Sequence, residues 1–300
     1  MPEQYFHASY KIAMINIITK FDKDLDHRKS LIIVNSPSSA GCMKVARWSM
    51  NDANNIGIAF VDFPFDSFTF PQKYTETEIK ALNDQNDFME WWWLTDVFCE
   101  FLKLDLNQFE KITVWHGDTT SDLMFLYFFA DYYRKPFHVL DVSLYAKNDR
   151  GVEPAFLNPT QLAKLHGKEK LLTDEELVNL RLKALNIKIG DTGYHHINDA
   201  GIVTNVQPED YTDAIYSVLQ RNGGELKMSR FVGELLGIDL KKCSTHFIEK
   251  LIIHHLRKGL IKAFWLDDGS EVSSSDCYFN IGQDPGPKEF CYRTVKVTLP

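Results

Sequence analysis

The chain lacks the short motifs that most readily identify a catalytic or metal-binding protein. It has five cysteines in 300 residues, scattered and without a Cys-x-x-Cys pair: Cys42, Cys99, Cys243, Cys277 and Cys291. Neither a zinc site nor a disulfide framework is therefore indicated. There is no Gly-Lys-Ser/Thr phosphate loop and no Gly-x-Gly-x-x-Gly fingerprint, which excludes two common nucleotide-binding motifs. A Ser-His-Asp elbow and a His-x-x-x-His pair are missing too, so these motifs mark no catalytic triad and no metal-binding residues.

Excess positive charge and long apolar runs are missing as well. The formal net charge of −8 argues against broad, non-specific attraction to nucleic acid or to an anionic membrane. The longest apolar run near the start, residues 12–18, is too short and too interrupted for a signal peptide or a membrane span. We therefore expect a cytoplasmic protein that does not bind membranes. Three hundred residues are long for a single core, which favours about two domains.

What the chain does have is one pattern written twice. Residues 31–34 form an apolar run of β type that enters the hydroxyl-rich loop 35–41, and a helical pattern follows. Residues 112–115 form a second such run, which enters the polar loop 116–122 before another helical pattern. A strand–loop–helix–strand unit that occurs twice predicts two βαβ halves in one parallel sheet.

Each unit then returns to an apolar strand that ends in an aspartate, Asp62 in the first unit and Asp141 in the second. The carboxyl ends of parallel strands meet at one edge of the sheet, which is where α/β sheets bind ligands. We therefore expect Asp62 and Asp141 to lie near the two polar loops.

The first loop has the residue types of an anion site. Asn35, Ser36, Ser38 and Ser39 offer an amide and three hydroxyls just before a helix. Helix N-terminal amides together with hydroxyls suit a phosphate or a carboxylate. The alternative is that Ser38 or Ser39 simply caps the helix.

The second loop is chemically richer. His116 is a candidate general base or metal ligand, and Asp118 is a candidate partner that orients it. Thr119, Thr120 and Asp122 follow within the same loop. The alternative is that Asp118 or Thr119 caps the helix while His116 packs against the sheet edge.

The rest of the chain changes character twice. Residues 151–207 read as a helical connector, with helix starts at Asn158 and Thr173 and a β-hairpin at 194–206. From residue 208 three short helices precede two β-type segments, in the order of a winged helix-turn-helix: 210–221, 228–236, 245–258, 260–266 and 277–281. An extended tail over 290–299 completes this part.

A winged helix invites a DNA-binding interpretation. Residues 226–263 contain eight Lys or Arg against three acids, and Lys250, Arg257 and Lys258 could share one face of the third helix. Ile253 shares that face, however, whereas a face that reads a groove is normally polar. The alternative is a domain or subunit interface, which we favour.

Beyond these patterns, the chain resembles a bacterial family, the domain of unknown function 1835, followed by its companion domain of unknown function 3658. The resemblance rests on residues 32–40, 62–67 and 114–122 for the first domain, and on 230–236 and 245–260 for the second. The family's leading His is Ile32 here, its Gly-Asp is Ser36-Pro37, and its Gly-Pro is missing. The resemblance covers roughly residues 30–265 and implies this architecture, but no activity.

Together the patterns predict an α/β protein. Residues 1–150 form a domain with the duplicated βαβ unit, 151–207 the connector and 208–300 a winged-helix-like domain. The leading hypothesis is that a small anionic or nucleotide-like ligand binds at the strand ends, with His116 and Asp118 as the acid/base pair. The ligand-binding residues are expected to be Asn35, Ser36, Ser38, Ser39, Asp62, Thr119, Thr120, Asp122 and Asp141.

The alternative is a DNA-binding or protein-binding regulator that acts through the C-terminal helices, with Lys250, Arg257 and Lys258 on nucleic acid. A scaffold in which both loops are purely structural also stays open, as does association into a homo-oligomer. The sequence does not identify a cofactor.

Overall fold

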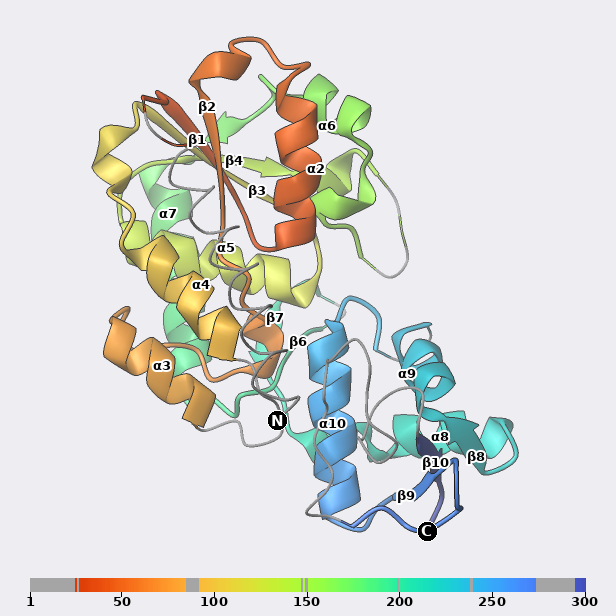
Figure 1. Cartoon of the computed structure of the whole chain (residues 1–300). Helices are drawn as coiled ribbons and strands as arrows, with labels where there is room; N and C mark the ends of the chain where they lie inside the picture. The colour runs from red at the N-terminus through yellow and green to blue at the C-terminus, as the bar shows by residue number, and fades with distance from the viewer. Residues whose placement is uncertain are drawn as a thin grey trace, which may run out of the picture.

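The computed structural model describes residues 25, 27–84, 92–146, 148, 151–198, 200–237, 240–273 and 295–300. Figure 1 shows a sheet flanked by helices, and below it a smaller group of helices and short strands formed by the C-terminal third. The hairpin of β6 (His195–Ile197) and β7 (Val203–Asn205) lies between these two parts.

A five-stranded sheet forms the core of the larger part. Its order is β2-β1-β3-β4-β5; the first four strands are parallel, and β5 is antiparallel to β4. The strands are β1 (Ser30–Val34), β2 (Ile56–Phe60), β3 (Lys111–His116), β4 (His138–Asp141) and β5 (Lys170–Leu171). All five residues of β2 are buried, as expected for a strand covered on both faces. The predicted α/β class with two βαβ units in one sheet is confirmed.

The two units run outward from the centre of the sheet. The first passes from β1 through α2 (Pro37–Arg47) to β2, and the second from β3 through α5 (Thr120–Tyr133) to β4. Because such crossovers are right-handed, units that run in opposite directions place their helices on opposite faces. Figure 1 shows α2 on one side of the sheet and α5 on the other. The strand order therefore reverses between β1 and β3, where open α/β sheets bind ligands.

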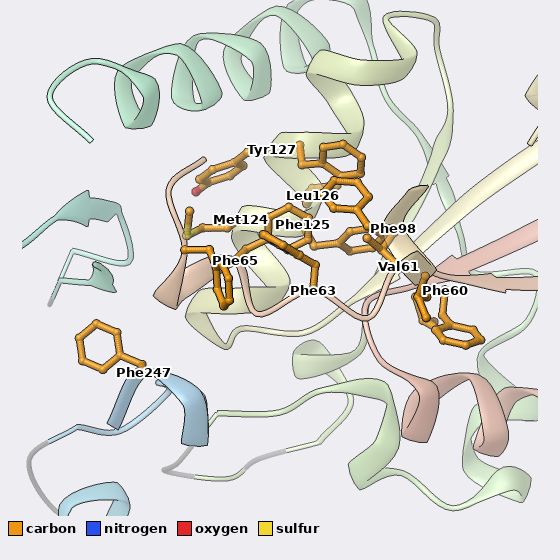
Figure 2. Packing of buried hydrophobic residues seen from close by; sticks show 14 of the residues in the cluster. Phe60, Val61, Phe63, Phe65, Phe98, Met124, Phe125, Leu126, Tyr127 and Phe247 are labelled. Atoms are coloured by element: carbon orange, nitrogen blue, oxygen red, sulfur yellow. The ribbon is translucent and has the colours of Figure 1, made fainter. Parts of the chain in front are cut away.

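An aromatic cluster fixes the loop that follows β2. Phe63 and Phe65 are buried with ring centroids 4.9 Å apart, and both pack against Phe98 of α4 (Trp92–Leu102). Figure 2 shows them beside Phe125 of α5. This packing holds the polar residues of the loop, Asp62 and Asp66, at the carboxyl edge of the sheet. Helix α3 (Glu76–Asp84) precedes α4.

The connector has the predicted capping boxes. Asn158 begins α6 (Pro159–Leu165) and Thr173 begins α7 (Asp174–Lys188), each with reciprocal side-chain and backbone bonds. The predicted hairpin is β6 (His195–Ile197) with β7 (Val203–Asn205). Strand β5 also comes from this segment and forms the edge of the main sheet, so the connector contributes to the first domain.

In the described residues of the C-terminal part, three α-helices accompany a three-stranded antiparallel sheet of order β8-β10-β9. Its elements are α8 (Thr212–Arg221), β8 (Glu225–Lys227), α9 (Met228–Gly237), α10 (Thr245–Arg257), β9 (Lys262–Trp265) and β10 (Val295–Thr298). The predicted wing strand at 277–281 lies outside the described residues, and β8 was not predicted. The winged-helix interpretation stays a prediction. Within the described part of the chain, no helix is long and apolar enough to cross a membrane.

Candidate functional site

The carboxyl edge between β1 and β2 holds an aspartate in an uncommon conformation. The backbone N–H of Asp62 donates to the carbonyl of Asn35 at 2.8 Å, and the φ of Asp62 is +50°. Among the described residues its carboxylate has no hydrogen-bond or ion-pair partner, and burial raises the pKa of Asp62 to about 7. A left-handed non-glycine residue with an unpartnered carboxylate is the kind of strained position that is common at binding sites.

The first loop uses its hydroxyls mainly to begin α2. Ser36 is the N-cap, because its Oγ accepts from the backbone N–H of Ser39 at 3.1 Å and donates to the Ser39 hydroxyl at 3.0 Å. The alternative that Ser38 or Ser39 caps the helix is therefore wrong. The helix begins at Pro37, so the N-cap is the residue before it, Ser36. Ser38 is exposed in the first turn, and its hydroxyl has no partner among the described residues.

Asn35 connects the two loops. Its Nδ2 donates to the hydroxyl of Ser121 in the first turn of α5 at 3.0 Å. Its Oδ1 is buried and has no hydrogen-bond partner within the described part of the chain. Native proteins leave few buried acceptors unpaired, so this oxygen calls for a donor that the described residues do not supply.

His116, at the end of β3, is nearly fully buried and held in one tautomer. Its Nδ1 lies 2.8 Å from the carbonyl oxygen of Gly117. A carbonyl only accepts, so Nδ1 carries the hydrogen and Nε2 is left as an acceptor, with no partner among the described residues. Burial lowers the pKa of His116, with the Asp141 carboxylate acting in the opposite direction. A neutral imidazole with a bare Nε2 is the form of a general base.

Asp118 makes no hydrogen bond to His116. Its Oδ1 accepts from the backbone N–H of Val152 at 2.6 Å, and its Oδ2 lies 2.7 Å from the ammonium of Lys242 in the C-terminal part. The expected pairing of Asp118 with His116 is therefore wrong in geometry. The Asp118 carboxylate points toward two segments that are distant in sequence. The group that orients the His116 ring is the Gly117 carbonyl.

The donors at the start of α5 are engaged within the chain. Thr119 is the N-cap and accepts from the Asp122 N–H at 3.2 Å. The Thr120 N–H donates to the Lys242 carbonyl at 2.8 Å, and the Thr120 hydroxyl accepts from the Ile197 N–H at 3.3 Å. The second loop therefore offers an anion fewer free donors than its sequence suggests, and α2 is the better placed helix.

A buried carboxyl, Asp122, and a half-buried one, Glu153, lie behind the second loop. Asp122 accepts from the Gly117 N–H at 2.7 Å, and burial raises its pKa well above the ordinary range, with the Glu153 carboxylate adding to the rise. Burial also raises the pKa of Glu153, which has no partner among the described residues. Glu153 was not predicted, since it lies in the connector and no local motif marks it. Asp141 accepts from the Ser143 N–H at 2.9 Å and begins a short turn after β4.

The three candidate nucleic-acid residues do not share one surface. The Lys250 ammonium is buried, donates to the carbonyls of Ser67 and Gly193 at 2.9 and 2.7 Å, and lies over the Tyr194 ring. Lys250 therefore joins the two parts and is not placed to contact nucleic acid. Arg257 and Lys258 are exposed at the end of α10.

The described side chains do not form a metal centre, since no group of three or more His, Cys, Asp or Glu residues among them could hold an ion. Comparisons with protein-family models, with curated proteins and with solved structures give no match to this chain. The resemblance to the domains of unknown function 1835 and 3658 therefore stays an interpretation of the quoted motifs.

Proposed function

We propose that the chain binds a small phosphorylated, nucleotide-like ligand at the carboxyl edge of the sheet between β1 and β3. The observation that carries the proposal is a set of acceptors without partners in the described part of the chain. These are Asn35 Oδ1, the carboxylates of Asp62 and Glu153, and His116 Nε2. Asn35 joins two parts of this edge, because its carbonyl accepts from the Asp62 N–H and its Nδ2 donates to the Ser121 hydroxyl in the turn that contains Asp122.

The chemistry of these groups defines the ligand. Bare acceptors suit hydroxyl or amino donors, such as those of a sugar or a base. The first turn of α2, with the exposed hydroxyl of Ser38 and the Ser36 cap, suits the phosphate. A nucleotide or a sugar phosphate has both kinds of group, whereas a simple anion would meet the carboxylates unfavourably. If the bound ligand reacts, His116 Nε2 is the group that takes up a proton.

Thermal shift and calorimetry test the proposal. Wild-type protein is screened against nucleoside monophosphates and sugar phosphates, each compared with its dephosphorylated form. A specific ligand at a hundredfold excess over Kd should add about 2.7 kcal/mol of stability. Asp62→Asn and Glu153→Gln should weaken binding at least tenfold.

Asp52→Asn is the matched control. Asp52 has a φ of +62° like Asp62, but it precedes β2 at the opposite end of that strand. Binding that survives at Asp62→Asn and Glu153→Gln as well as in the control would contradict the proposed site. A flat screen of wild-type protein would contradict the proposed ligand class and favour the C-terminal part as the functional surface.

A further inference from the structure

We infer that the Asp122 carboxylate positions His116 through the backbone of Gly117, and that the negative charge of Asp118 plays no part in this. The inference deepens the proposed function, because it concerns the candidate base of the same site. It rests on a chain of hydrogen bonds that runs from Asp122 to the imidazole.

The first link fixes the peptide before Gly117. The Gly117 N–H donates to Asp122 Oδ2 at 2.7 Å, and this carboxyl is buried in the first turn of α5. The bond sets the plane of the peptide that joins His116 to Gly117. Because α5 is buried nearly all round, its first turn is a rigid support for this bond.

The second link fixes the peptide after Gly117. The Asp118 N–H donates to the Val152 carbonyl at 3.0 Å, and the Val152 N–H donates back to the Asp118 carboxylate at 2.6 Å. With both of its peptides held, Gly117 has little rotational freedom. Its carbonyl is directed at His116 Nδ1, 2.8 Å away.

The consequence is chemical. A His residue whose Nδ1–H donates to a fixed carbonyl keeps its lone pair on Nε2. Asp118 is engaged with Val152 and Lys242, so it holds the loop to the connector and to the C-terminal part. Among the described residues, the Asp122 side chain is bonded only within this edge of the sheet, to the Gly117 N–H and to the Asn35 side chain.

The tautomer can be read directly by NMR. In protein labelled with ¹⁵N-histidine, long-range ¹⁵N–¹H spectra show which ring nitrogen is protonated, and His116→Gln assigns the signal. Wild-type protein at neutral pH should show His116 protonated on Nδ1 alone. Asp122→Ala should give a mixture of both tautomers and a His116 that takes up its second proton at higher pH than in wild type. Asp122→Asn keeps an acceptor and should restore the wild-type pattern.

Asp118→Asn is the control that separates the two aspartates. It removes the charge paired with Lys242 and should leave the His116 tautomer unchanged. An Nε2-protonated wild type, an unaltered tautomer in Asp122→Ala, or equal effects of Asp118→Asn and Asp122→Ala would each overturn the inference. These spectra need no ligand. A wild type with the expected tautomer that binds none of the screened ligands would therefore contradict the proposed function and leave the positioning role standing.

Discussion

The carboxylate of Asp66 accepts two hydrogen bonds from Ser244, a residue 178 positions away. The backbone N–H and the hydroxyl of Ser244 both lie 2.6 Å from it. Ser244 is the N-cap of α10, since its hydroxyl also accepts from the Phe247 N–H. Asp66 follows β2 in the loop that the aromatic cluster holds in place. One buried carboxylate therefore ties the carboxyl edge of the sheet to the start of the main helix of the C-terminal part.

Removal of this carboxylate should weaken the attachment of the C-terminal part. Asp66→Ala leaves the half-buried Ser244 N–H without its acceptor, and we expect a loss of about 2 kcal/mol in the free energy of unfolding. Burial raises the pKa of Asp66 to about 6, which shows that desolvation of this carboxylate is unfavourable. The variant removes that unfavourable contribution, which offsets part of the loss. Urea denaturation followed by tryptophan fluorescence measures the change. Asp105→Ala, which removes an exposed cap, should cost less than about 1 kcal/mol. Equal losses in the two variants would contradict a tie between the two parts.

The regular elements of the sheet could be predicted because their signals are local. The apolar runs that became β1 and β3 lead into polar loops, and each unit returns to a strand followed by an aspartate. The caps at Asn158 and Thr173 were recognised for the same reason, since a capping box lies within four residues. The strand β8 has three residues and one buried side chain, too little for a period-two pattern.

The candidate site could be predicted only in part. Both loops were found and do lie together, as the bond from Asn35 to Ser121 shows. The partners of Asp118 could not be predicted, because Val152 and Lys242 reach it from segments with no local relation to its loop. Burial of Lys250 was missed for a similar reason. Its helix looks amphipathic in the sequence, and what covers the lysine comes from the hairpin and from the loop after β2.

Lys250 should stabilise the junction through its two hydrogen bonds to carbonyls. Lys250→Met preserves length and removes both donors, and we expect a loss of about 1–3 kcal/mol at neutral pH. Burial lowers the pKa of Lys250 to about 8, so between pH 8 and the ordinary pKa near 10.5 the unfolded chain binds more protons than the folded chain. The stability of wild type should therefore gain from this group as pH rises through that window, and the deficit of Lys250→Met should widen.

Lys258→Met, at the C-cap of the same helix, is the control for Lys250→Met. Lys258 is exposed, so its substitution should change stability by no more than about 0.5 kcal/mol. Denaturant titrations of both variants at pH 7 and pH 9.5 give the comparison. If Lys250→Met leaves the free energy of unfolding unchanged, Lys250 is again a candidate partner-binding residue.

Gly117 should tolerate no side chain. A Cβ at this position would lie 1.5 Å from the Val152 carbonyl oxygen, which is backbone and held by the Asp118 N–H. Gly117→Ala must displace one of the two segments, and we expect a loss of about 2 kcal/mol or more. Gly41→Ala is the matched control, because a Cβ there meets nothing within 4 Å in the middle of α2. It should stabilise the chain by about 0.5–1 kcal/mol. In thermal melts, the melting temperature should fall in Gly117→Ala and rise in Gly41→Ala.

Asp62 should make the folded chain less stable at alkaline than at mildly acidic pH. Burial raises its pKa from 3.8 to about 7, so between these values the folded chain binds a proton that the unfolded chain does not. The contribution of Asp62 to the free energy of unfolding therefore falls as pH rises from 3.8 to 7 and stays unfavourable above. Asp62→Asn keeps the left-handed backbone, removes the charge, and should stabilise the chain by about 2 kcal/mol at pH 8.

The gain from Asp62→Asn should shrink as pH falls below 7 and vanish near pH 4, because wild-type Asp62 is then neutral in the folded chain and becoming neutral in the unfolded one. Melting temperatures of wild type and variant from pH 4 to pH 8 trace this difference, and Asp52→Asn should show no such trend. Binding sites commonly retain groups that lower stability. We therefore expect Asp62→Asn to gain stability and to lose ligand affinity. A variant that is less stable than wild type at pH 8 would mean that the carboxylate is held by favourable contacts, and that Asp62 is a structural residue of the β2 loop.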